Sequence, residues 1–130
     1  LAQRRPRLLD AVAVAMRIVK ASVVSVMAGT MPAQPASLAV NWLEGPATAD
    51  RLDVGLVTLT AGGMSPPHRH DGGQVMIGLQ GTGFVEHDGH RHEFGAGDIV
   101  ICAPGEFHVH GAVEGSDFAH LTITTLGYHL

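Results

Sequence analysis

From Leu38 onward, short apolar runs alternate with breaks rich in Gly and Pro, and this punctuation restricts the folds available to the chain. We interpret as strands the runs near residues 39–43, 54–60, 74–79, 83–87, 90–94, 99–102, 108–112 and 118–125. A spacing of roughly 8 to 12 residues between strands is typical of a sandwich or barrel. Asp88-Gly89 lies between two matched runs and predicts a tight type I′ hairpin. We therefore predict an all-β domain over residues 38–130.

The composition supports one compact domain and argues against a nucleic-acid partner. The 130 residues are 45% hydrophobic and only 15% charged, as expected for a chain that buries a single core. The formal net charge is −4, and the only basic cluster is Arg4, Arg5 and Arg7, so the basic stripe of a nucleic-acid-binding domain is missing. The single cysteine, Cys102, lies in an apolar run and is expected to be buried.

Residues 1–37 form an irregular N-terminal extension that differs from the rest, being rich in Ala and Val and free of histidine. The apolar stretch from Leu8 to Gly29 is interrupted by charged residues, so we expect no membrane span. Two interpretations stay open. Residues 16–36 resemble a secretory signal peptide, which would imply export to the periplasm. Otherwise the segment is a strand or helix packed on the barrel or on a second subunit, in a cytoplasmic protein.

Nine histidines are present, and the segment from Gly62 to Gln74 concentrates the chemistry. Because residues i and i+2 of an extended chain point the same way, His68 and His70 are predicted to project side by side. Gln74 opens the next strand, and its carboxamide oxygen can return to the same point. Pro104-Gly105 makes a turn that delivers His108 at a later strand start. We predict that His68, His70, Gln74 and His108 bind one metal ion.

Three imidazole nitrogens and one amide oxygen suit a divalent transition metal with two open positions. Mn²⁺, Fe²⁺, Co²⁺ and Ni²⁺ fit this set, and Zn²⁺ fits at lower coordination number. None of the ligands is anionic, so the site keeps the positive charge of the ion and favours Lewis-acid chemistry or anion capture.

The spacings match both motifs of the cupin superfamily. Gly62, His68, His70, Gln74 and Gly81 keep every interval of the first motif, with Gln in place of the usual Glu. Gly97, Gly105 and His108 match the second motif, although its proline is displaced to Pro104 and its final Asn is Ala112. The chain thus resembles a cupin, which implies a double-stranded β-helix, the jelly-roll barrel of that superfamily.

Within the superfamily, Gln74 speaks against the germin and oxalate oxidase type and resembles single-domain manganese cupins that include bacterial hydroxynitrile lyases. The resemblance implies His68, His70, Gln74 and His108 as ligands, manganese as the metal, and catalytic histidines at His110 and His120. It also implies a homodimer. His110 shares the inward face of His108, whereas simple alternation in the last strand would turn His120 to solvent.

Met76 and Gly78 share the face of Gln74 and are candidates for the substrate pocket, with core packing as the alternative. A small-molecule substrate follows from the metal site. We favour a metal-dependent enzyme with cyanohydrin lyase chemistry. An iron-dependent dioxygenase and a non-catalytic small-molecule-binding cupin are the alternatives, since a fold does not determine a function.

Overall fold

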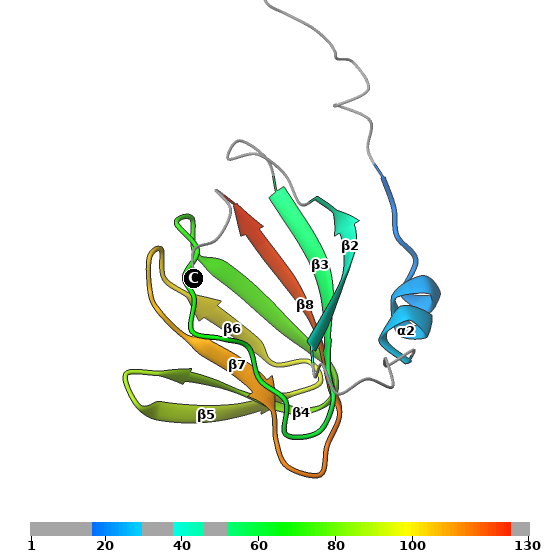
Figure 1. The fold of residues 1–130 in the computed structure, drawn as a ribbon. Helices are drawn as coiled ribbons and strands as arrows, with labels where there is room; N and C mark the ends of the chain where they lie inside the picture. Colours follow the sequence, from blue (N-terminus) through cyan, green and yellow to red (C-terminus); the bar gives the residue numbers. More distant parts are fainter. Residues whose placement is uncertain (1–16, 30–37, 46–51, 126–130) are drawn as a thin grey trace, which may run out of the picture.

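The computed structural model describes residues 17–29, 38–45 and 52–125, and it consists mainly of antiparallel strands (Figure 1). The elements are α2 (Ala21–Gly29), β2 (Leu38–Glu44), β3 (Leu52–Leu59), β4 (Gln74–His87), β5 (His90–Gly95), β6 (Ile99–Cys102), β7 (Val109–Ala112) and β8 (Phe118–Thr125). The predicted strands are present. The runs near 74–79 and 83–87 are one continuous strand, β4, where we expected two.

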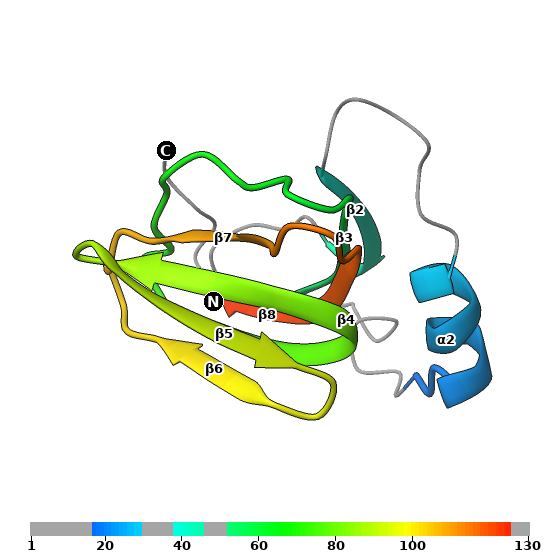
Figure 2. The same cartoon turned by 90° about the horizontal axis from the view of Figure 1, so that it is seen from below.

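The long strand β4 joins the two halves of the barrel, and both sets of partners are visible beside it in Figure 2. Its first half pairs with β6 and β8, while its second half pairs with β5 and β7. The register against β8 shifts between Gly78 and Gln80, where the strand changes partners. This topology is the double-stranded β-helix that the cupin resemblance implies.

The β4–β5 hairpin confirms the turn predicted at Asp88-Gly89. Both residues have positive φ, 50° at Asp88 and 75° at Gly89, as a type I′ turn requires. Strand register then pairs His87 with His90 across the turn. At this position, beside the turn, the side chain of His87 contacts Glu106 and Phe107 in the loop before β7.

The sheet formed by β3, β8, β4 and β6 has aliphatic side chains on its outer face and a mixture of polar and apolar side chains on its inner face. On the outer face, Val75 lies between Ile101 and Ile123, and Ile77 lies between Ile99 and Leu121. The inner face carries Gln74, Met76, His120, Thr122 and Thr124, all of them buried. Since directly opposed residues of antiparallel strands share a face, the register alone separates these two sets.

Helix α2 covers one part of the outer face (Figure 1). Ala28 and Met27 pack against Leu56 and Ala119, which are almost fully buried. The extension thus includes a helix packed on the barrel, one of the two arrangements left open by the sequence. No helix among the described residues is long and apolar enough to cross a membrane. The rest of the proposed signal-like segment, residues 16 and 30–36, lies outside the described residues.

The apolar core lies inside the barrel, next to His120, whose ring centroid is 5.4 Å from that of Phe118. Phe94 and Phe118 pack edge to face with ring centroids 5.0 Å apart, and Leu59 and Met76 complete the cluster with no exposed surface. Cys102 is buried, as predicted, and burial raises the pKa of its thiol to about 11. The interior thus contains both this apolar cluster and a set of buried polar side chains.

Candidate metal centre

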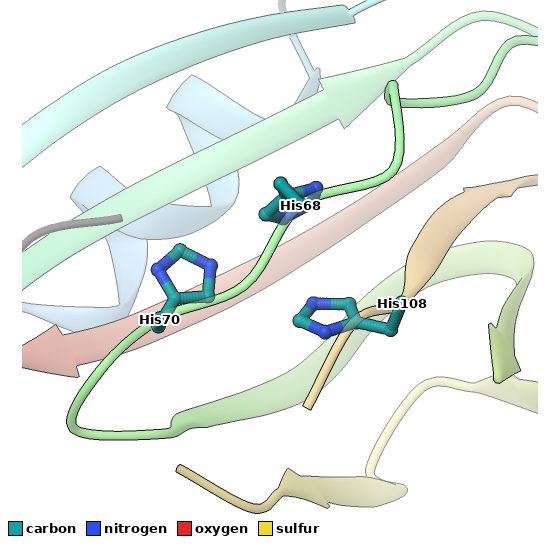
Figure 3. A group of neighbouring side chains, drawn as sticks. All are labelled: His68, His70 and His108. Carbon is teal, nitrogen blue, oxygen red and sulfur yellow. The ribbon is translucent and has the colours of Figure 1, made fainter. Parts of the chain in front are cut away.

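Three histidines from two distant segments converge inside the barrel (Figure 3). The potential ligand atoms of His68, His70 and His108 all lie within 4.8 Å of one another, and all three side chains are buried. The His68 and His108 rings have centroids 4.6 Å apart, and the His68 and His70 rings 5.0 Å. As predicted from the alternation, His68 and His70 approach the same point from one strand-like segment.

The backbone holds the two segments in register. His68 and His108 exchange both peptide hydrogen bonds, with N to O distances of 3.0 and 2.9 Å. The His70 carbonyl accepts from the amides of Gly73 and Gly105, at 3.0 and 2.9 Å. Backbone hydrogen bonds between the two segments therefore fix the positions from which the three histidine side chains extend.

Two carbonyl oxygens fix which nitrogen of each ring faces the centre. Nδ1 of His68 donates to the Pro66 carbonyl at 2.8 Å, and Nδ1 of His108 donates to the Glu106 carbonyl at 2.9 Å. A neutral imidazole carries one proton, so Nε2 of each ring presents a lone pair. Such contacts from the remote nitrogen are usual for histidines that bind metals.

Gln74 brings a fourth donor to the same point. Its Oε1 lies 2.8 Å from Nε2 of His108, while its amide nitrogen donates to the hydroxyl of Thr122. Both atoms of the short contact are acceptors, because the proton of the neutral His108 ring is on Nδ1. A cation bound by both lone pairs would stabilise this contact. The donor set, three imidazoles and one amide oxygen, therefore fits a divalent metal ion.

Burial favours the neutral form of the His108 imidazole. Desolvation lowers the pKa of His108, although the Glu106 carbonyl partly offsets this effect. Neutral nitrogens are the form that binds metals, and they add no charge to that of the ion. The electrostatic character predicted from the sequence, a cationic site without anionic ligands, agrees with this arrangement.

His110 and His120 extend the cluster into the barrel. The centroid of His110 lies 5.0 Å from that of His68 and 5.0 Å from that of His120, and both side chains are buried. Burial lowers the pKa of His110 well below its usual range and that of His120 to about 4. Nδ1 of His110 and both ring nitrogens of His120 make no hydrogen bond within the described residues. His120 thus faces inward, as the resemblance implied and simple alternation did not.

The two proposed pocket residues differ. Met76 is fully buried and belongs to the apolar core, which was the alternative reading for it. A methyl group at Gly78 would lie 2.0 Å from the carbonyl oxygen of Gly95. The backbone of Gly95 therefore occupies the space beside Gly78. Gly78 allows two backbone segments to lie close together and leaves no room there for a ligand.

Sequence reasoning missed the residues that orient the site. Thr122 holds the amide of Gln74, and the hydroxyl of Ser65 accepts from the amide of His110 at 3.1 Å. Thr122 shares the inward face of His120, so the resemblance at His120 could have indicated it. Nothing in the sequence pointed to Ser65.

Comparisons with known proteins place these features in context. The family described as "Cupin domain" matches residues 55–124, which is more than half of the chain. An (R)-mandelonitrile lyase of Granulicella tundricola is 37% identical over 68 residues, covering 52% of each chain. The dimethylsulfoniopropionate lyase DddW of Ruegeria pomeroyi is 34% identical over 82 residues, covering 60% of this chain and 53% of that one. The match thus spans about half the length of each curated relative.

One solved structure supports the fold alone. An uncharacterized protein with a double-stranded β-helix domain from Klebsiella pneumoniae subsp. pneumoniae superposes with a TM-score of 0.69 at 18% identity. The superposition covers 89% of this chain and 97% of that one.

Proposed function

Because this chain belongs to the cupin family, we propose that it is a metal-dependent enzyme that cleaves or forms a small oxygen-bearing substrate by lyase chemistry. Cyanohydrin cleavage and formation, of the hydroxynitrile lyase type, is the leading reaction, and manganese is the leading metal. Iron, nickel, cobalt and zinc are compatible with the same donors. The names of both curated relatives, each a lyase, support the reaction class.

One observation carries the proposal. Oε1 of Gln74 and Nε2 of His108 lie 2.8 Å apart beside the imidazoles of His68 and His70, and both atoms are acceptors when the proton of His108 is on Nδ1. This arrangement is costly in a protein without a cation, because buried acceptors lose their hydration and repel each other. A bound divalent ion would supply Lewis acidity, which polarises a substrate oxygen and stabilises developing negative charge.

His110 and His120 then act as proton carriers. In cyanohydrin cleavage, a neutral imidazole accepts the hydroxyl proton, the carbonyl forms, and the bond to the nitrile carbon breaks. The departing cyanide takes up the proton as hydrogen cyanide, so the imidazole returns to its neutral form. Burial lowers the pKa of both rings, so they are neutral near pH 7 and each has a nitrogen lone pair that can accept a proton.

Two alternatives are retained. An iron-dependent dioxygenase could use the same four donors, with oxygen and substrate bound together at the metal. A non-catalytic binding protein could use the site to hold an anion. The pair of buried imidazoles beyond the metal donors favours an enzyme, since a simple binder does not need proton carriers.

The test is to purify the chain without a histidine tag, measure bound metals by elemental mass spectrometry, and assay mandelonitrile cleavage under nitrogen. We expect about one metal ion per chain, its loss in His68→Ala and His108→Ala, and oxygen-independent release of benzaldehyde that is lost in His110→Ala. A chain that cannot be loaded with metal would refute the site. Turnover only in the presence of oxygen would establish the dioxygenase, and metal binding without turnover of any substrate would favour the binding protein.

We also propose a second copy of the chain as the partner of the outer sheet face. Ile99 and Ile101 are 62% and 76% exposed there, and their neighbours across the strands are aliphatic and uncharged. A face formed by rows of aliphatic side chains can pack against the same face of a second copy, as a two-fold interface requires. The homodimer implied by the family resemblance would cover this face.

A further inference from the structure

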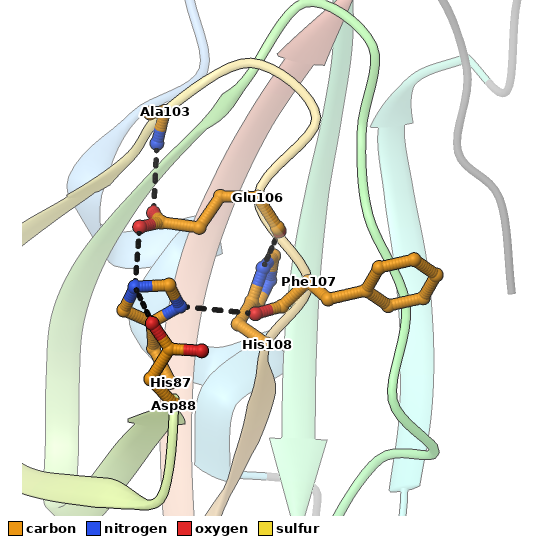
Figure 4. Close-up of polar contacts among 6 residues, drawn as sticks. All are labelled: His87, Asp88, Ala103, Glu106, Phe107 and His108. Atoms are coloured by element: carbon orange, nitrogen blue, oxygen red, sulfur yellow. Dashed lines mark hydrogen bonds and ion pairs between the residues drawn. The ribbon is translucent and has the colours of Figure 1, made fainter.

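His87 is the last residue of β4, and its side chain contacts the loop that precedes His108 (Figure 4). Its Nε2 lies 2.9 Å from Oε2 of Glu106, and its Nδ1 lies 3.3 Å from the carbonyl oxygen of Phe107. Both partners are acceptors, so each contact is a position in which the ring can donate a hydrogen bond to the loop. The nearby carboxylate of Asp88, at 3.5 Å, adds a second negative group beside the ring.

The loop that His87 contacts, residues 103–107, is connected to two of the proposed ligands. The Glu106 carbonyl accepts from Nδ1 of His108, and the Gly105 amide donates to the carbonyl of His70. Glu106 also stabilises its own loop, because its Oε1 accepts from the amide of Ala103 at 3.1 Å. A shift of this loop would therefore move the group that orients His108.

We propose that His87 is a positioning residue for the metal centre, acting on His108 through Glu106 and the 103–107 loop. The inference rests on the metal site of the proposed function. The side chain of His87 lies on the solvent side of the loop and is 43% exposed. Its contacts with Glu106 and Phe107, here called the clamp, hold the loop from that side.

The energetics point to metal affinity as the quantity affected. An ion pair with this much exposure contributes little to folding, because water screens it. Groups that orient metal ligands, in contrast, typically change metal affinity by about 10- to 100-fold. His87 lies one contact further out than the Glu106 carbonyl, so we expect the lower end, a loss of about 10-fold on its removal.

Charge and positioning predict opposite results, which makes the inference testable. Removing the His87 ring takes a hydrogen-bond donor away from the Glu106 carboxylate and leaves its negative charge less compensated near the site, and a negative group attracts a cation. If electrostatics governed affinity, His87→Ala would therefore bind metal more tightly. If the clamp positions His108, the same variant binds more weakly.

The experiment titrates the metal-free full chain with Co²⁺ alone and follows its visible absorption, which reports both affinity and ligand geometry. We expect His87→Ala to bind about 10-fold more weakly with an altered spectrum, and His87→Gln, which keeps one donor, to recover part of the loss. His90→Ala is the matched control. This exposed imidazole faces His87 across the turn and makes no hydrogen bond or ion pair within the described residues, so affinity should not change.

Thermal unfolding of each metal-free variant in chelator separates positioning from folding, since the clamp should leave the midpoint nearly unchanged. Unchanged or tighter Co²⁺ binding by His87→Ala would overturn the inference while the metal site stands. An equal loss in His90→Ala would also overturn it, because the effect would then belong to the hairpin as a whole. Failure of the unsubstituted chain to bind Co²⁺ would overturn the proposed function and this inference together.

Discussion

The buried imidazole of His120 should make the metal-free protein less stable as the pH falls below neutrality. Its side chain has no exposed surface, and burial lowers its pKa from the ordinary 6.5 to about 4. In the unfolded chain the same ring takes up a proton near pH 6.5. Between these two values the unfolded state binds more protons, so acid favours unfolding there and stability rises with pH.

The size of the effect follows from the two pKa values. Each unit of pKa difference corresponds to about 1.4 kcal/mol, so the full contribution is about 3 kcal/mol, and about 2 kcal/mol of it is lost between pH 7 and pH 5. Below pH 4 the folded protein also binds the proton, and the loss from this group levels off. A loss of 2 kcal/mol is a large fraction of the stability of a small domain.

The assay is urea unfolding of the metal-free protein in chelator at pH 7, 6 and 5, compared with His120→Gln. Glutamine keeps a polar side chain of similar size in the barrel but does not titrate. The variant should lose about 2 kcal/mol less than the unsubstituted protein over this pH range, whatever its stability at pH 7. The other histidines remain in both proteins, and since His120 also lowers the pKa of His110, the difference reports His120 together with its effect on His110. Equal pH dependence in both proteins would refute the reasoning, since it would mean that His120 is not held neutral by burial.

Further predictions concern the metal donors, the close packing and the outer face. Thr122→Val removes the acceptor that orients the amide of Gln74, and isothermal titration with Mn²⁺ should show affinity about 10-fold weaker at unchanged stoichiometry. Gly78→Ala places a methyl group against the Gly95 carbonyl and should lower the free energy of unfolding by about 2 kcal/mol or more in urea, whereas Gly95→Ala, with its nearest neighbour at 3.4 Å, should cost less. Ile101→Glu puts a charge on the outer face and should convert a dimer to a monomer in sedimentation, with metal content retained; an unchanged oligomer would exclude this face as the interface.

The strands and the shared direction of His68 and His70 could be predicted because their signals are local. Alternation and turn residues delimit strands, and the spacing of His68 and His70 specifies a shared direction wherever the segment is extended. The continuity of β4 could not be predicted, because Gly81 resembles a break between two strands. In the structure its positive φ, 77°, accompanies a close approach to the Asp117 carbonyl within a strand that continues past it.

The contact between His87 and Glu106 could not be predicted because it is purely tertiary. These residues are far apart in the chain, and each has an ordinary local explanation, a hairpin tip for His87 and a turn for Glu106. Their proximity depends on how the β4–β5 hairpin lies against the loop before β7. Patterning within a single strand contains no information about such a contact.

His120 points into the barrel, although the alternation of polar and apolar residues in β8 predicts that it faces solvent. In most sheets with one covered face, apolar side chains point to the core and polar ones to water. Here β8 directs His120 and Thr122 inward and Leu121 and Ile123 outward, while β3 and β4 also direct apolar residues of the core inward. Buried polar groups are costly unless something satisfies them, and exposed aliphatic rows are costly unless something covers them. Both costs are explained together if the interior exists to bind a metal and a polar substrate, and the exterior to pack on α2 and a second copy. The inward direction of His120 and Thr122 therefore supports the proposal that the barrel interior is a binding site as well as a core.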